Sequence, residues 1–261
     1  MTALEFRNML YTWYAKNGRG VLPWRKTEDP YKIFISELML QQTQAERVVP
    51  KYEAFIKKFP AVKIIAKAEV SAVLKLWQGL GYNRRALFAK RAAEVVMKEH
   101  KGIFPKEIST LENLSGIGPY TARAIAAFAY NQPNAFVETN IRTVIIHHFF
   151  SKKKKVTDIE ITKVVASVLD NKNPRKFYSA MMDYGSYLKK EGVQTHRKSH
   201  TYKKQSKFNG SFRQIRGILV RDYTKGGYAS VTKLLRNQKE NKPEYKAAFA
   251  ALLKEGIISK K

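Results

Sequence analysis

Residues 114–122 read Leu-Ser-Gly-Ile-Gly-Pro-Tyr-Thr-Ala. Gly116 and Gly118 suit a tight turn, because glycine adopts backbone conformations that other residues avoid. Pro119 suits the first position of a helix, where its missing N–H leaves no hydrogen bond unmade. The stretch therefore predicts a turn that opens a helix, and the backbone amides at that helix start can hold a phosphate group. An ordinary turn between two helices is the alternative.

Most of the chain on either side of this turn carries apolar residues at spacings of three and four, which is the pattern of packed helices. Proline and glycine separate these segments, and alternating strand patterns are scarce. We expect an all-α fold with helices in residues 33–44, 48–58, 70–76, 83–99, 121–130, 159–169 and 175–189. The first 16 residues also have helical spacing instead of a signal-peptide core, so export is not expected.

The predicted helices group into two lobes and a small C-terminal part. Residues 22–130 are expected to form a six-helix lobe that contains the glycine turn, and residues 1–21 with 131–188 a second helical lobe. Residues 189–211 are basic and weakly periodic, which predicts a linker or a segment that wraps around a lobe. Residues 212–261 carry three short helical patterns, which we interpret as a small module similar to a helix-turn-helix or winged-helix domain.

The charge balance favours a polyanionic partner. The chain has 49 Lys and Arg against 21 Asp and Glu, a formal net charge of +28. Tyr, Trp and Phe are interleaved with the positive charge, and stacking combined with phosphate neutralisation is typical of nucleic-acid binding. No apolar run approaches the roughly 20 residues that span a bilayer. We therefore expect a nucleic acid and no membrane, the alternatives being charge for solubility or binding to an anionic membrane surface.

Two carboxylates stand out beside the glycine turn. Glu37 lies in an otherwise apolar helical segment, and Glu138 lies in residues 137–142, Val-Glu-Thr-Asn-Ile-Arg. One carboxyl can donate a proton while the other stabilises a cationic sugar, so such a pair beside a phosphate-binding turn predicts cleavage of a glycosidic bond in DNA. The alternatives are a Glu37 on a solvated helix face or paired to a lysine, and a Glu138 that only caps a helix.

Further motifs carry a family resemblance. They are residues 22–25, Leu-Pro-Trp-Arg; 36–44, Ser-Glu-Leu-Met-Leu-Gln-Gln-Thr-Gln; 76–82, Leu-Trp-Gln-Gly-Leu-Gly-Tyr; and 181–185, Met-Met-Asp-Tyr-Gly. With the turn, and in this order, they resemble the MutY adenine glycosylases of the helix-hairpin-helix superfamily, whose members remove adenine mispaired with 8-oxoguanine. The resemblance covers residues 5–185 and implies two helical lobes flanking a DNA-binding cleft.

The resemblance also implies catalytic roles. Glu37 is expected to be the general acid that protonates the departing base. Glu138 stands where the family has an aspartate followed by glycine and asparagine, so it is expected to stabilise the sugar cation with a side chain one methylene longer. Asn140 is expected to orient the acidic pair. Tyr120 occupies the position of a lysine in bifunctional relatives, and because a phenol forms no imine we expect no lyase activity.

The same resemblance implies a set of DNA contacts. Gln42 and Tyr82 are expected to enter the double helix and fill the space around the lesion, which lowers the free energy of base extrusion. A core aromatic is the alternative for Tyr82. The predicted DNA-binding residues are Arg25, Gln42, Tyr82, Gly116, Gly118 and Thr121.

Cysteine is absent, which excludes disulfides and the four-cysteine iron–sulfur cluster that the resemblance places soon after Gly185. No cofactor and no metal are expected, although His196 and His200 have a metal-compatible spacing of four and a monovalent cation at the hairpin is allowed. We expect a monomer in the cytoplasm, associated with the nucleoid, that acts on double-stranded DNA with a mismatch or lesion. A thymine or uracil mismatch glycosylase and a non-catalytic lesion-binding or structure-binding protein are the alternatives.

Overall fold

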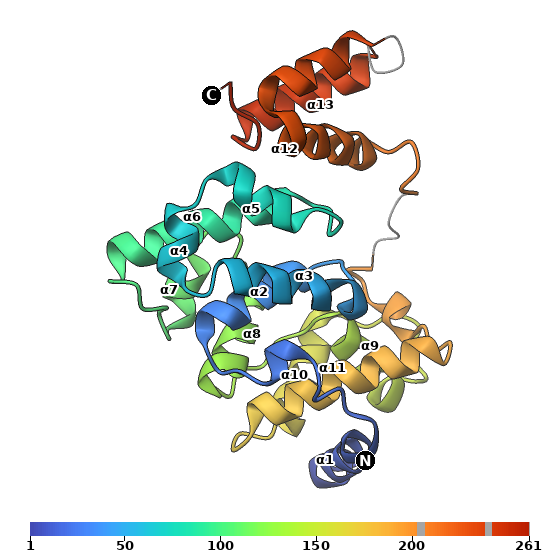
Figure 1. Cartoon of the computed structure of the whole chain (residues 1–261). Helices are drawn as coiled ribbons and strands as arrows, with labels where there is room; N and C mark the ends of the chain where they lie inside the picture. The colour runs from blue at the N-terminus through green and yellow to red at the C-terminus, as the bar shows by residue number, and fades with distance from the viewer. Residues whose placement is uncertain (203–206, 238–241, 261) are drawn as a thin grey trace. The chain divides into compact units, whose positions relative to one another are not determined.

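The computed structural model describes residues 1–202, 207–237 and 242–260 (Figure 1). These residues form helices joined by turns, and their β pairing is limited to an isolated bridge between Val156 and Ser199. The predicted all-α fold is confirmed. Within the described ranges, no helix combines the length and the apolar character that a bilayer crossing requires.

The chain folds into two compact units. The first contains residues 1–37, 105–113 and 117–204, and the second contains residues 38–104, 114–116 and 205–261. One of the points where the chain passes between the units falls inside α2 (Pro30–Leu40), between Glu37 and Leu38. This grouping differs from the predicted lobe of residues 22–130, because α8 (Pro119–Tyr130) packs against α11 (Pro174–Lys190) of the first unit.

Helix α8 of the first unit is buried over most of its surface. Alanine allows this close packing, and Ala122, Ala124, Ala126 and Ala127 are fully buried. Besides α8, α11 and the first part of α2, the unit comprises α1 (Ala3–Asn17), η1 (Pro23–Arg25), α7 (Ile108–Glu112), α9 (Thr139–Phe149), α10 (Asp158–Val168) and η2 (Thr195–Lys198).

Helix α9 was not among the predicted helices. Its sequence is rich in threonine, isoleucine and valine, whose branched β carbons give them a modest helix propensity. Packing overrides that preference here, since Ile141, Val144, Ile145 and Ile146 are fully buried and α9 lies against α11. The next helix, α10, begins with a capping box between Thr157 and Glu160, which is visible in the sequence.

The second unit comprises α3 (Ala45–Lys58), α4 (Val62–Lys67), α5 (Val70–Trp77), α6 (Arg84–Glu99), α12 (Phe212–Arg236) and α13 (Pro243–Lys254). Its core includes Phe55 and Trp77, which pack edge to face with ring centroids 5.8 Å apart. Small residues on α6, including Ala89 and Ala93, are fully buried, and α6 packs against α4 and α5.

The C-terminal module, residues 212–260, contains the three predicted helical segments. The backbone of α12 leaves the helical conformation at Gly226 and Gly227, so α12 consists of two helices joined by a kink, and α13 follows. Gly227 has φ +66°, a conformation that glycine adopts without strain. α12 packs on α13 and on α5 (Figure 1). The described part of the module contains no strand, so it lacks the β hairpin that forms the wing of a winged-helix domain.

The basic segment predicted as a linker, residues 189–211, is packed over its first half. Lys189 and Lys190 end α11, and η2 lies against α9. Ser199 pairs with Val156, and its hydroxyl contacts the Asp158 carboxylate. The wrap-around alternative therefore describes residues 189–202, because these hydrogen bonds fasten the segment to the first unit. Residues 203–206 lie outside the described residues.

Gly185 lets α11 pass close to the start of α9, since a Cβ added there would lie 2.4 Å from the Asn140 carbonyl oxygen. We expect Gly185→Ala to force the two helices apart and to lower the free energy of unfolding by about 1–3 kcal/mol, as overpacking does. Urea unfolding measures this change. Gly217→Ala on α12 is the matched control, because no atom lies within 4 Å of its added Cβ and the exchange favours a helix. Equal unfolding midpoints for both variants would contradict the close contact.

Candidate active site

Glu37 occupies the buried side of α2 in the first unit and is only 7% exposed. Its neighbours Phe34, Ile35 and Leu38 are fully buried, so the helix carries the carboxyl into an apolar environment. Burial raises the pKa of Glu37 to about 7. The Tyr120 hydroxyl donates a hydrogen bond to Glu37 Oε2 at 3.1 Å, and burial raises the pKa of Tyr120, which therefore remains a neutral donor. At neutral pH, Glu37 can hold a proton and release it.

Arg25 of η1 lies beside this carboxyl. Its positive charge opposes the rise in the pKa of Glu37, although burial outweighs it. The guanidinium is held by Asp183, at 3.5 Å, and by the Ser179 carbonyl. Its Nε and Nη1 atoms are buried and have no hydrogen-bond partner among the described residues. Unpaired buried donors carry a free-energy cost, so these two atoms require an acceptor, such as a water molecule or a ligand atom, that the described residues do not supply.

Glu138 is the N-cap of α9. Its Oε1 accepts a hydrogen bond from the Ile141 amide at 2.8 Å, and its Oε2 accepts one from Asn140 Nδ2 at 3.3 Å. Burial raises the pKa of Glu138, while the Ile141 amide and the nearby Lys189 and Arg142 oppose the rise. The glutamate side chain, one methylene longer than the aspartate of the family pattern, thus folds back on its own helix. The same carboxylate therefore caps α9 and supplies the negative charge of the site. The Asn140 Oδ1 atom is buried and has no partner among the described residues.

The carboxyls of Glu37 and Glu138 influence each other, since the charge of Glu138 contributes to the raised pKa of Glu37. The first unit therefore brings together four predicted residues from three helices and their caps: Glu37, Tyr120, Glu138 and Asn140. One carboxyl is surrounded mostly by apolar atoms, whereas the other is surrounded by donors and cations. Environments that differ in this way separate an acid from an anion.

Three charged residues of this site, Asp183, Arg19 and Lys189, were not predicted from the sequence. Asp183, which is 2% exposed, accepts hydrogen bonds from the backbone and the side chain of Arg19 at 2.8–3.0 Å and thereby organises Arg25. Lys189 interacts electrostatically with Glu138. Asp183 lies in the quoted motif of residues 181–185, which is a signal, whereas Arg19 and Lys189 carry no local pattern that distinguishes them from other basic residues.

The predicted phosphate-binding turn has the expected backbone. Gly116 has φ +80°, and a Cβ added there would lie 2.7 Å from the Cβ of Phe88, so only glycine fits without displacement. Gly118 is the N-cap of α8 and is extended, with φ −94° and ψ −179°. Gly118 has no side chain with which to cap α8, and Thr121 in the first turn of α8 is buried. This geometry is compatible with an anion at the helix start, and the role of the three residues stays a prediction.

Gln42 and Tyr82, both predicted to enter DNA, lie in the second unit. Gln42 is exposed and Tyr82 is half-buried. Both adopt a left-handed backbone, with φ +55° and +47°. Residues other than glycine rarely adopt this conformation. Each such residue stores about 1 kcal/mol or more of strain that surrounding contacts must balance.

Arg85 supplies those contacts. It is 5% exposed and donates hydrogen bonds to carbonyl oxygens on both loops, including Gln41 at 2.7 Å and Gly81 at 3.0 Å. Its guanidinium also lies over the rings of Trp77 and Tyr82. Burial lowers the pKa of Arg85 to about 10, so the group stays charged at neutral pH. One guanidinium thus fixes the backbone on either side of both predicted DNA-inserting residues.

The chain's residues do not fit a cysteine-ligated iron–sulfur cluster, since it has no cysteine. Where the resemblance places the cluster, side-chain hydrogen bonds hold the segment, among them one from Lys198 Nζ to the Ser151 carbonyl and one from the Thr195 hydroxyl to the Thr143 carbonyl. His196 lies in η2, so its spacing to His200 is not that of an α-helix. Within the described ranges, no group of three or more His, Asp or Glu residues is placed to hold a metal ion.

Comparison with known proteins places this chain in a family. Residues 35–167 match the HhH-GPD superfamily base excision DNA repair protein family. The chain is 35% identical over 189 residues to the adenine DNA glycosylase of Buchnera aphidicola subsp. Baizongia pistaciae, covering 72% of this chain and 54% of that protein. It is 36% identical over 181 residues to that of Mycolicibacterium smegmatis, covering 68% and 61%. The chain spans about half the length of the curated relatives it matches.

Solved structures give the same fold. A thermostable thymine-DNA glycosylase superposes with a TM-score of 0.63 at 26% identity, covering 70% of this chain and 86% of that one. Endonuclease III in a non-covalent DNA complex superposes with a TM-score of 0.60 at 15% identity, covering 72% and 87%, which shows the fold alone. The resemblance inferred from the motifs is confirmed at the level of the superfamily. The chain belongs to the HhH-GPD superfamily of base excision DNA repair proteins.

Proposed function

We propose that this chain is a monofunctional DNA glycosylase of base excision repair that hydrolyses the N-glycosidic bond of adenine opposite 8-oxoguanine or guanine. The observation that carries the proposal is the buried Glu37 carboxyl with a pKa of about 7, hydrogen bonded to Tyr120 and sensitive to the charge of Glu138. The relatives named adenine DNA glycosylase support adenine as the base.

In the first step, Glu37 donates its proton to a ring nitrogen of an extruded adenine. Adenine leaves poorly as an anion, and protonation makes it a neutral leaving group. Tyr120 donates to Glu37 Oε2, so it fixes the carboxyl and stabilises the carboxylate formed after proton transfer. The unpaired Nε and Nη1 donors of Arg25 suit acceptor atoms of the base or of the DNA backbone.

In the second step, the bond between C1′ and the base breaks and leaves positive charge on the sugar. Glu138 stabilises this charge as an anion, because the Ile141 amide, Asn140 and Lys189 favour its ionised form. A water oxygen then adds to C1′ and releases its proton to a carboxylate, which leaves an abasic site and a free base. The unpaired Asn140 Oδ1 suits a hydrogen bond from that water.

Further supports come from the surface and the turn. The formal charge of +28 suits double-stranded DNA with a mismatch or lesion, whose phosphates the turn at Gly116 and Gly118 and the first turn of α8 at Thr121 would contact. Gln42 and Tyr82 would fill the space left by the extruded base. The proposal also includes a monomeric state, an association with the nucleoid and activity without an iron–sulfur cluster. A monovalent cation bound at the turn is compatible with the proposal.

One observation favours a second substrate. The solved structure that matches at 26% identity is a thymine-DNA glycosylase, and Tyr120 is compatible with either base. Base release from duplexes that contain A opposite 8-oxoguanine, T opposite G or U opposite G, followed by alkaline cleavage, separates the two activities. Tight binding to these duplexes with no base release from any of them would instead identify a non-catalytic binding protein.

Glu37→Gln should bind lesion DNA nearly as well as the parent and release the base at least about a hundredfold more slowly, since proton donation contributes about 10²–10⁴-fold. Single-turnover excision with enzyme in excess measures the chemical step. Glu112→Gln is the matched control, because the carboxylate of this glutamate is already paired with Arg123. Excision by Glu37→Gln at the parent rate would reject Glu37 as the acid.

The rate should depend on pH in a bell shape. Glu37 must be protonated, so the rate falls as pH rises above about 7, where burial places its pKa. Glu138 must be ionised, so the rate also falls as pH drops through the pKa of Glu138, which burial raises above its ordinary value. Single-turnover rates between pH 4 and pH 9 give the profile, and a rate that still rises above pH 8 would contradict it.

Stability checks the same pKa without catalysis. Between pH about 4.5 and about 7, the folded chain retains the Glu37 proton that the unfolded chain has lost, so the stability of the parent falls as pH rises. Glu37→Gln lacks this dependence and should gain roughly 3 kcal/mol relative to the parent across that window. Parallel stability curves for parent and variant would show that Glu37 has an ordinary pKa.

Tyr120 and Glu138 decide the type of reaction. The parent should form no borohydride-trapped adduct with DNA, whereas Tyr120→Lys places an amine in the site and should create trapping and strand nicking. Glu138→Gln keeps the size but removes the charge, so base release should fall by at least about a hundredfold. Glu138→Asp should retain part of the activity. Efficient trapping by the parent would overturn the monofunctional assignment. Full activity of Glu138→Gln would show that the Glu138 carboxylate is only a helix cap.

A further inference from the structure

Tyr82 has an unusual position in the loop between α5 and α6. Its backbone is left-handed, as are those of Gly79 and Gly81, with φ values of +47°, +90° and +72°. Its side chain is half-buried. A strained residue of this kind keeps its conformation only where neighbouring groups hold it. Arg85 holds the backbone, since its side chain donates to the Gly81 and Tyr82 carbonyl oxygens at 3.0 and 3.4 Å.

A second arginine, from a distant part of the chain, holds the phenol. Arg213 lies in the first turn of α12, and its Nη1 donates a hydrogen bond to the Tyr82 hydroxyl at 2.5 Å. Its guanidinium carbon is 5.5 Å from the centroid of the Tyr82 ring and 5.6 Å from that of Phe208. The contact therefore combines a hydrogen bond with cation–π attraction, and it fixes both the tip and the face of the ring.

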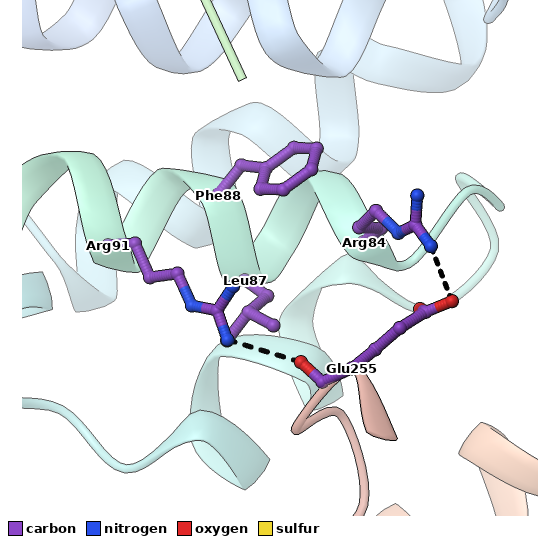
Figure 2. Close-up of a pocket in the computed structure, with 5 residues that line it drawn as sticks. All are labelled: Arg84, Leu87, Phe88, Arg91 and Glu255. Carbon is purple, nitrogen blue, oxygen red and sulfur yellow. Dashed lines mark hydrogen bonds and ion pairs between the residues drawn. The ribbon is translucent and has the colours of Figure 1, made fainter. Parts of the chain in front are cut away.

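The C-terminal module is fastened where it can keep this contact. The Glu255 carboxylate pairs with Arg84 of α6 at 2.5 Å and with Arg216 of α12 at 2.6 Å. Arg91 donates to the Glu255 backbone carbonyl at 3.2 Å, as Figure 2 shows beside the Arg84 pair. The residues that follow, Ile257 and Ile258, are buried. Glu255 thus ties α12 and α13 to the helix that begins two residues after Tyr82.

We propose that Arg213 is a positioning residue for Tyr82, and that the C-terminal module serves to hold Arg213 in place for base extrusion. The inference rests on the proposed function, in which Tyr82 enters the DNA. A tyrosine whose rotamer is fixed beforehand loses less side-chain entropy when it inserts between bases. The guanidinium also brings a positive charge to the point where a DNA strand approaches. Arg213 acts through Tyr82 and takes no part in bond cleavage.

Base extrusion can be followed without bond cleavage. The probe is a duplex with 2-aminopurine next to a target adenine opposite 8-oxoguanine, the target sugar carrying a 2′-fluoro group that blocks hydrolysis. Unstacking of 2-aminopurine raises its fluorescence. We expect Arg213→Ala to lower the equilibrium constant for extrusion about tenfold, the usual size of one lost hydrogen bond to a charged donor. Arg221→Ala is the matched control, since Arg221 is an exposed arginine on the same helix.

A double-mutant cycle with Tyr82→Ala distinguishes positioning from general support of the fold. If Arg213 acts through Tyr82, Arg213→Ala has no further effect on extrusion once the ring is gone. Additive effects of Arg213→Ala and Tyr82→Ala would overturn the proposal. Stronger extrusion by Arg213→Ala would also overturn it, because the contact would then be a restraint that DNA must break. An equal loss in Arg221→Ala would reduce the effect to one of charge.

Two further variants keep the test decisive. Should Arg213→Ala fail to fold, Tyr82→Phe removes the same hydrogen bond from the other side and should lower extrusion at least about threefold. Glu255→Gln weakens the anchor of the module and should reproduce part of the Arg213→Ala loss, whereas an unchanged constant would reject the role of the module. Base release by the parent is measured separately, so a duplex that is distorted but never cleaved refutes the proposed function and leaves this inference standing.

Discussion

The Glu37 carboxyl is buried with a neutral phenol as its hydrogen-bond donor, and this placement constrains the rest of the first unit. An ionised carboxylate at such a position lacks the water that would stabilise it, so the side chain retains its proton to about pH 7. The apolar residues of α2 exclude that water, and Tyr120 reaches Glu37 because Pro119 starts α8 at the residue before it. The packing of the site therefore sets the proton affinity of Glu37.

Glu138, at the N-cap of α9, has a different environment from Glu37, because hydrogen-bond donors and cations lie around its carboxylate. Its oxygens accept hydrogen bonds from the Ile141 amide and from Asn140, and Lys189 and Arg142 favour its charged form. Burial still raises the pKa of Glu138, but more groups oppose that rise at Glu138 than at Glu37. Such an asymmetry allows one carboxyl to act as an acid and the other as an anion. The additional methylene of a glutamate is accommodated because the side chain caps its own helix.

The second unit depends on a different buried charge. Arg85 donates hydrogen bonds to backbone carbonyl groups in the last turn of α2, in the turn that follows α2 and in the loop before α6. Those two loops carry Gln42 and Tyr82, whose left-handed backbones are strained. Hydrogen bonds from one guanidinium to both loops can balance that strain and set the two loops relative to each other within the unit. The C-terminal module adds Arg213 to the same loop through a contact that spans 131 residues of sequence.

Local sequence determined most of the helices, the glycine turn and the identity of the superfamily. Apolar spacing located α3, α5, α6, α8, α10 and α11 to within a few residues, because each buries one face in a regular pattern. Gly116 and Pro119 indicated the turn for backbone reasons that need no partner. The candidate carboxylates Glu37 and Glu138 were also visible in the sequence, since their motifs are contiguous.

The tertiary structure decided what no local pattern contains. Helix α9 was missed because its β-branched residues favour strands until buried contacts stabilise a helix. The grouping of α8 with α11, the attachment of residues 189–202 to the first unit, and the Arg19–Asp183–Arg25 network all join residues far apart in sequence. The pKa of Glu37 and the reach of Arg213 to Tyr82 depend on distances between such residues. Sequence alone determined which groups are present, and folding decided which of them meet, because burial and hydrogen bonding act through space.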